Sequence, residues 1–173
     1  GGVPSIARVR LVCGLAGVTL EQLGEYNQRY QLNNDPAIAA LEWSSELTPW
    51  NSLPTDTLDT SPQRSVTDEE LPSVPHGAPI QLRVTTNPPE TYVRWDPSLR
   101  RLVDQREAVR VAYFATAGHF DVARAGLEST ANPTWSTTNR WIAPETAGVV
   151  TWWIVVRDDR GGVGWATGRL RVT

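Results

Sequence analysis

The chain contains no lysine, no methionine and only one cysteine among its 173 residues. All sixteen cationic side chains are therefore arginines, which excludes a lysine nucleophile or a lysine Schiff base. The single Cys13 excludes an internal disulfide. Because Val9, Leu11 and Cys13 alternate in the stretch RVRLVCG, we expect a small buried thiol on the inward face of a strand. No apolar run reaches the roughly 18 residues that a membrane-spanning helix needs, so we expect no membrane span.

The net charge is also small. The formal net charge of −3 and a pI near 5.4 provide no basic surface of the kind that binds nucleic acid or an anionic membrane. We therefore expect neither partner. The opening stretch GGVPSIARVR lacks an initiator methionine, which predicts a processed chain whose leader has been removed.

Alternating apolar and polar residues, bounded by Pro, Gly, Asn or Asp, recur along the chain and predict an all-β fold. The predicted strands are SIARVRLV, PIQLRVTT, ETYVRW, EAVRVAYFATAG, GVVTWWIVV and VGWATGRLRVT. One helix is expected within residues 19–30, where leucines and tyrosines fall near one face. Because Gly24 interrupts it, we predict one or two turns.

Residues 44–76 are dense in proline, serine, threonine and aspartate. This composition predicts a long irregular loop that forms no regular core element. Trp50, Leu53 and Leu58 supply apolar anchors that would hold such a loop against the domain surface.

The last third carries several short motifs at ordered spacing. They are Tyr113 followed by ATAG at 115–118, WIAP at 141–144, GVV at 148–150 and RDDRGG at 157–162, and NNDPAIAALEW at 33–43 precedes them. In these motifs the chain resembles the immunoglobulin-like, PKD-like or cadherin-like, domains of bacterial surface proteins. The resemblance implies an immunoglobulin-like antiparallel β-sandwich over residues 33–173, with the 44–76 loop as an insertion. Residues 1–32 would then be an added edge strand and a short helical segment, or the end of an upstream module.

Catalytic and metal-binding patterns are weak. His76 and His119 both stand beside turn glycines without a partner motif, so we expect no enzyme and no cofactor. Side-chain oxygens do gather at two places in the sequence, at Asn33, Asp35, Asp158 and Asp159. They fit either a weak calcium site or caps of two turns that accept backbone N–H groups.

The stretch TWWIVVRD at 151–158 is apolar on both faces of the predicted strand. Even positions, Trp152 among them, are expected in the core. The odd positions then point outward with Phe114 of a neighbouring strand, and they give the predicted partner-binding residues Trp153, Phe114, Val155 and Arg157. The alternative is that the chain's own loop or its N-terminal strand covers this face.

These observations favour a non-catalytic, exported structural or assembly subunit that docks other proteins through an aromatic sheet face and strand edges. We expect it in the periplasm, at the outer membrane or outside the cell. The alternative function is a carbohydrate-binding module, in which exposed tryptophan rings stack on a polysaccharide. Its predicted sugar-binding residues are Trp135, Trp141 and Arg140.

Overall fold

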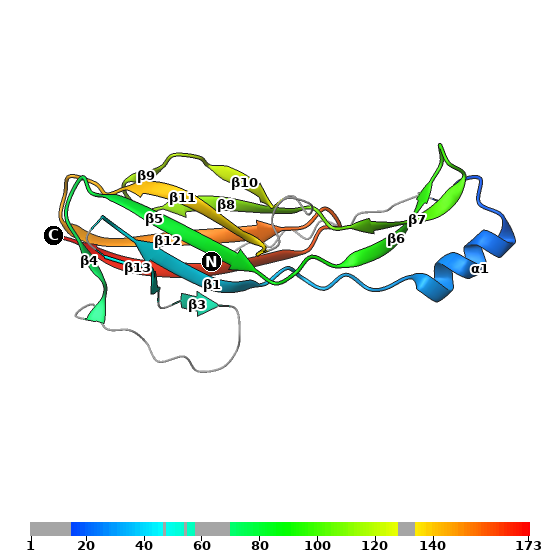
Figure 1. Ribbon diagram of the computed structural model, residues 1–173, viewed down its shortest axis with the longest axis horizontal. Coiled ribbons are helices and arrows are strands. Elements are labelled where there is room, and N and C mark those ends of the chain that lie inside the picture. Colours follow the sequence, from blue (N-terminus) through cyan, green and yellow to red (C-terminus); the bar gives the residue numbers. More distant parts are fainter. Residues whose placement is uncertain (1–14, 47, 54, 58–69, 128–133) are drawn as a thin grey trace, which may run out of the picture. The chain divides into compact units, whose positions relative to one another are not determined.

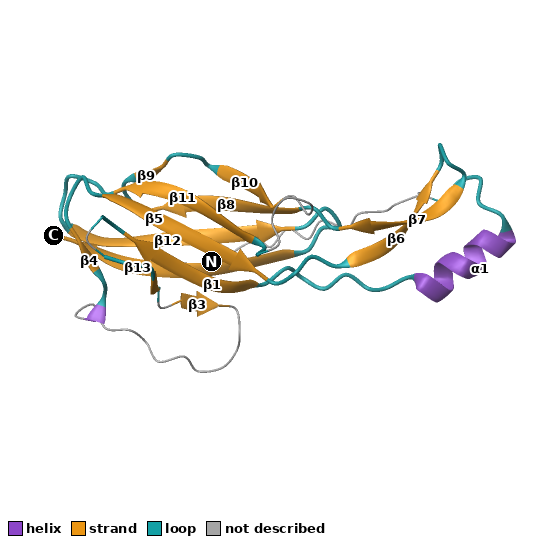
Figure 2. Cartoon of the chain, in the orientation of Figure 1, coloured by secondary structure: helices purple, strands orange, loops and turns teal. Residues whose placement is uncertain are grey.

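The computed structural model describes residues 15–46, 48–53, 55–57, 70–127 and 134–173. Within them the chain forms one helix and thirteen strands (Figure 2). In order these are α1 (Leu20–Arg29), β1 (Ile38–Ser44), β2 (Asn51–Ser52), β3 (Thr55–Thr57), β4 (Ser73–Val74), β5 (Pro79–Thr86), β6 (Thr91–Asp96), β7 (Arg101–Arg106), β8 (Val109–Ala115), β9 (His119–Phe120), β10 (Arg124–Leu127), β11 (Ser136–Ile142), β12 (Gly148–Arg157) and β13 (Val163–Val172). The prediction of an all-β fold is confirmed.

The chain divides into two compact units. The first contains residues 1–32 and 91–106, and the second contains residues 33–90 and 107–173. The expected boundary at residue 33 coincides with the start of the second unit. Residues 91–106 interrupt that second unit, and no composition shift in the sequence marks this excursion.

The second unit is a sandwich of two sheets (Figure 1). One sheet has the strand order β2-β1-β5-β11-β9, and the other has the order β10-β8-β12-β13-β3 with β4 also pairing with β13. All pairs are antiparallel except that of β4 with β13. Both sheets therefore present long strands to each other, and their facing sides bury a common core.

Strict alternation along the strands builds this core. In β12, whose burial alternates along most of its length, the four predicted inward positions are all buried: Val150, Trp152, Ile154 and Val156. Trp152 meets Trp141 of the opposite sheet edge to face, with ring centroids 5.1 Å apart. Each buried aromatic ring removes roughly 150–250 Å² from water, so this pair is a large part of what holds the two sheets together.

Gly118 occupies a turn that no other residue fits. Its φ is +70°, and a Cβ built there would lie 2.3 Å from the carbonyl oxygen of Ile142 and 2.7 Å from the ring of Trp141. The turn expected after the strand at 107–118 therefore depends on glycine both for backbone conformation and for space.

The segment 44–76 differs from its prediction. Rather than an irregular insertion alone, its described part forms three short strands, β2, β3 and β4, of which β3 and β4 extend the six-stranded sheet. Leu53, an expected anchor, is buried in the main core, as is Val74. Trp50 stays 39 % exposed, and Leu58 lies outside the described residues. Composition misled here because two or three residues suffice to pair with the edge of a sheet.

The first unit contains α1 and the antiparallel hairpin β6–β7. The helix is longer than predicted, at ten residues. A capping box between Thr19 and Gln22 starts it, and Arg29 near its end pairs with Glu25 one turn earlier and with Asp104 of the hairpin. These contacts offset the cost of Gly24 in the helix interior. The predicted N-terminal strand SIARVRLV lies outside the described residues.

Candidate functional site

The outward face of the six-stranded sheet carries two large aromatic rings side by side. Trp153 of β12 lies directly opposite Phe114 of β8 in the strand register. Phe114 is 53 % exposed and Trp153 is 38 % exposed, so the described residues do not cover this pair. The pairing of these two residues, expected from alternation alone, is confirmed.

Apolar side chains continue across the same face. Val155 lies opposite Ala112 on β8 and Trp165 on β13, and all three are partly exposed. Val149 and Val163, near the two ends of the strand pair β12–β13, are 36 % and 40 % exposed. We call this surface the aromatic face, defined by the outward residues Ala112, Phe114, Val149, Thr151, Trp153, Val155 and Trp165.

The outward face of the other sheet is polar by contrast. Glu42, Arg83 and Thr138 are in register across β1, β5 and β11. Arg83 forms a bidentate ion pair with Glu42, with both N–O distances at 2.8 Å, and its guanidinium carbon lies 4.3 Å from the ring centroid of Trp50. Among the described residues, the two outer faces of the sandwich therefore differ in kind, since exposed apolar side chains concentrate on the aromatic face.

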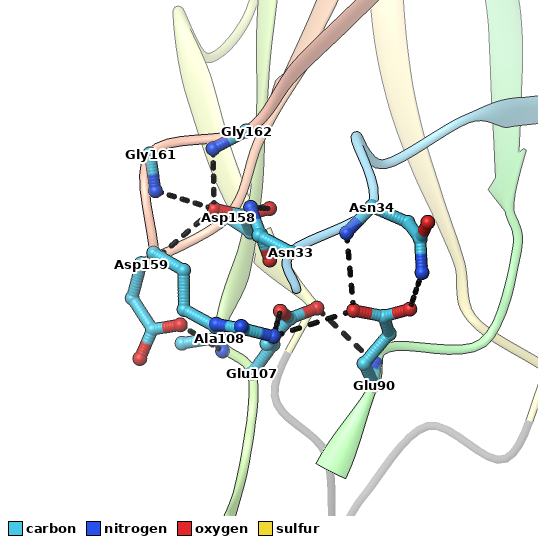
Figure 3. Close-up of polar contacts among 10 residues, drawn as sticks. Asn33, Asn34, Glu90, Glu107, Ala108, Asp158, Asp159, Gly161 and Gly162 are labelled. Atoms are coloured by element: carbon cyan, nitrogen blue, oxygen red, sulfur yellow. Dashed lines mark hydrogen bonds and ion pairs between the residues drawn. The ribbon is translucent and has the colours of Figure 1, made fainter. Parts of the chain in front are cut away.

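A second notable cluster lies at the turn between β12 and β13. There Asp158 Oδ1 accepts backbone N–H groups from Arg160, Gly161 and Gly162, at 2.9, 2.7 and 2.7 Å. Its other oxygen, Oδ2, accepts from the side-chain amide of Asn33 at 2.9 Å (Figure 3). A Cβ on Gly162 would lie 2.3 Å from that same Oδ2, so the close approach requires glycine.

Arg160, in the same turn, reaches two carboxylates. Its Nη1 lies 3.1 Å from Glu107 and 3.3 Å from Glu90. The side chain of Arg160 is 11 % exposed and that of Glu107 is 3 % exposed. Asn34 also binds Glu90 through its backbone N–H and its side-chain amide (Figure 3). We call these four residues the ion-pair cluster.

Burial raises the pKa of Glu107 above its ordinary value of 4.5, although hydrogen bonds from the backbone of Glu90 and from Arg160 act in the opposite direction. The backbones of these two glutamates are also paired, with Glu107 N–H donating to the carbonyl of Glu90 at 2.9 Å. The cluster therefore joins the two points where the chain leaves and re-enters the second unit.

The residues predicted for calcium lie in this region, where backbone or side-chain donors engage the three aspartates, whereas Oδ1 of Asn33 is buried without a hydrogen-bond partner. Asp35 accepts from the backbone N–H of Val163 at 3.1 Å, and Asp159 accepts from that of Ala108 at 3.3 Å. Asp158 has the turn-capping role that was the alternative. In the part of the chain that the structure describes, no three histidine, cysteine or acidic residues are grouped to hold a metal ion. The calcium site remains a prediction.

The sugar platform predicted from Trp135 and Trp141 does not form. Trp141 is fully buried in the core, where its indole N–H donates to the carbonyl of Ala117 at 3.2 Å. Trp135 is partly exposed with a φ of +49°, and Arg140 forms an ion pair with Asp121 at 2.8 Å. The prediction of a sugar platform is wrong because Trp141 lies on the inward side of β11. The few apolar residues around it in the sequence did not show which side of the strand faces the core.

Sequence reasoning missed the ion-pair cluster and one arginine. Glu90 and Glu107 are 17 positions apart, and only the fold brings them to Arg160. Arg110 lies opposite Arg157 on the outward side of β8. The alternation that predicts an outward Phe114 also predicts an outward Arg110, because residues 110 and 114 share a face of the strand.

No family model matches this chain, and no curated protein matches it either. Among the described residues, no helix is long and apolar enough to cross a membrane.

Proposed function

We propose that this chain is a non-catalytic docking module, and that it binds another protein through the aromatic face. The observation that supports this most directly is the exposed cross-strand pair of Phe114 and Trp153 on the outer side of the six-stranded sheet. Exposed apolar patches of this kind are typical of interaction sites, and tryptophan is enriched among the residues that dominate binding energy.

Strand edges would extend the docking surface. β10 is the outer strand of the six-stranded sheet next to β8, and it is only four residues long. A partner strand added there would continue the sheet beside the aromatic face, with main-chain hydrogen bonds supplying affinity. Short edge strands limit uncontrolled association, which suits a module that binds one chosen partner.

The finer identity rests on the resemblance in sequence. The motifs at 113–118, 141–144, 148–150 and 157–162 resemble those of immunoglobulin-like domains of bacterial surface proteins. We accordingly propose an immunoglobulin-like sandwich in an exported surface assembly. Fold alone does not specify a partner, so the docking face is the part of the proposal that an experiment must address.

Site-specific photo-crosslinking in the producing cells tests it. A photoreactive phenylalanine analogue placed at Phe114 should crosslink to one defined protein, whereas the same analogue at Thr138, on the outward side of the other sheet, should not. Trp153→Ala should abolish that crosslink while leaving the thermal midpoint within a few degrees. Equal crosslinking at both positions, or a crosslink that survives Trp153→Ala, would refute docking through this face.

A further inference from the structure

Four strands of the six-stranded sheet carry charge of one sign, whereas the edge strand β3 contributes Asp56, which is in register with Thr167 of β13. The strands β8, β10, β12 and β13 contain no aspartate and no glutamate, and their five charged residues are Arg110, Arg124, Arg157, Arg169 and Arg171. Removing these five positive charges from the formal net charge of −3 leaves −8 for the rest of the chain. An acidic protein thus places five of its sixteen arginines on these four strands.

Three of these arginines, Arg110, Arg124 and Arg157, have no side-chain hydrogen bond or ion pair with any other described residue. Arg110 and Arg157 are moreover directly opposite each other in the pairing of β8 with β12, and both are exposed. Like charges in directly opposed positions destabilise a sheet. The sheet therefore carries an electrostatic cost at this position that the described residues do not relieve.

The other sheet is the internal comparison. Its outward arginines each have an acid from the same chain, since Arg83 binds Glu42 and Arg140 binds Asp121, both at 2.8 Å. Counter-charges are thus supplied on one outer face of the sandwich. On the aromatic face the described residues leave Arg110, Arg124 and Arg157 without them.

These arginines border the apolar surface on one side. Arg124 of β10 is opposite Ala112, and the Arg110–Arg157 pair is one outward position further along the strands from Ala112 and Val155. Phe114 and Trp153 lie one outward position away in the other direction. Since two residues of a strand advance about 6.5–7 Å, one extended segment of five residues would reach both the rings and the arginines.

From this arrangement we propose that the segment bound on the aromatic face is an acidic stretch of another protein, with apolar side chains on the rings and carboxylates on Arg110 and Arg157. This rests on the proposed docking function. Guanidinium groups bind carboxylates bidentately, and interfaces between proteins are enriched in aromatic residues and arginine. A second copy of this chain is a poor occupant, because face-to-face pairing would bring arginines against arginines.

Two synthetic nonapeptides serve as probes, one alternating glutamate with valine and tryptophan and one with glutamine at each glutamate position. Fluorescence anisotropy of the labelled peptides with the full chain measures both affinities. We expect the acidic peptide to bind at least tenfold more tightly at 50 mM salt, and the difference to shrink at 500 mM salt, where charges are screened within a few Å. The double variant Arg110→Gln, Arg157→Gln should remove the preference.

The matched control is Arg83→Gln, Arg140→Gln, which removes the same charge from the other sheet and should keep the preference. Equal binding of the two peptides to the wild-type chain, or a preference that survives Arg110→Gln, Arg157→Gln, overturns the acidic partner while leaving docking intact. Binding of both peptides that is insensitive to Trp153→Ala overturns docking itself. Binding of polygalacturonate in place of the acidic peptide, or self-association in sedimentation, overturns the protein partner.

Discussion

Replacing Arg160 with methionine removes the guanidinium that Glu90 and Glu107 share, while leaving a side chain of similar length. Glu107 would then keep its charge at 3 % exposure, with only the backbone N–H of Glu90 still donating to it, at 3.1 Å. Breaking a buried ion pair from one side costs about 3–5 kcal/mol, because an uncompensated charge stays behind. Glu90 is 29 % exposed and can recruit water, so we expect the lower end, about 3 kcal/mol at pH 7.

The loss should depend on pH in a stated direction. Burial already raises the pKa of Glu107, and Arg160 is one of the groups that lower it, so the variant raises it further. A carboxyl whose pKa is higher in the folded chain than in the unfolded chain favours folding below its ordinary value of 4.5, and this contribution is lost as pH rises through the folded pKa. The deficit of Arg160→Met should therefore shrink as pH falls from 7 toward 4.5.

Urea unfolding followed by tryptophan fluorescence at several pH values measures both effects. Glu107→Gln combined with Arg160→Met removes the stranded charge and should recover part of the loss, whereas independent sites would add. A loss below about 1 kcal/mol, the level of an exposed ion pair, or a deficit that does not change with pH, would refute the reasoning.

Three further predictions concern the core. Gly118→Ala should destabilise the chain by about 1–3 kcal/mol, because the residue has a positive φ and its Cβ would contact the Ile142 carbonyl. Gly126→Ala, with open space at its Cβ, should cost at most a fraction of that. Similar thermal midpoints for the two variants would contradict this. Trp152→Ala should cost about 3–5 kcal/mol and Trp153→Ala under about 1, since only the first ring is fully buried; equal losses in urea unfolding would place Trp153 in the core. Burial raises the pKa of Tyr113 to about 12, so its share of stability is present below pH 10 and declines as pH rises toward 12, and Tyr113→Phe should lack that decline in alkaline denaturation.

The fold was accessible from sequence where alternation is long. The strand PIQLRVTT appears as β5 with the same ends, and GVVTWWIVV is contained in β12. Strands β1, β7 and β11 were not predicted, because short segments with charged or small residues are only weakly periodic. Helix propensity predicted a shorter helix than the one at residues 20–29. The capping box and the ion pairs of Arg29 stabilise the additional length.

The two candidate sites show the same division. Phe114 and Trp153 could be placed on one face because alternation within β8 and β12 fixes which side each residue takes, once the two strands are neighbours. Trp141 was predicted on the exposed side of its strand. This was wrong because the residue type alone does not show whether a tryptophan on a sheet faces the core or solvent. The candidate calcium ligands were predicted because their side chains carry oxygen atoms. In the fold, Asp158 instead accepts hydrogen bonds from three backbone N–H groups of its own turn.

By itself the sequence determined the class of fold, the inward side of the longest strands and the exclusion of lysine chemistry and of an internal disulfide. These follow from composition and from a period of two, both of which are local properties of the chain. Only the tertiary structure decided that Arg160 meets Glu90 and Glu107, and that Arg110 opposes Arg157. Such contacts depend on which strands become neighbours and in what register, and that choice is made by the burial of the whole core rather than by any one segment.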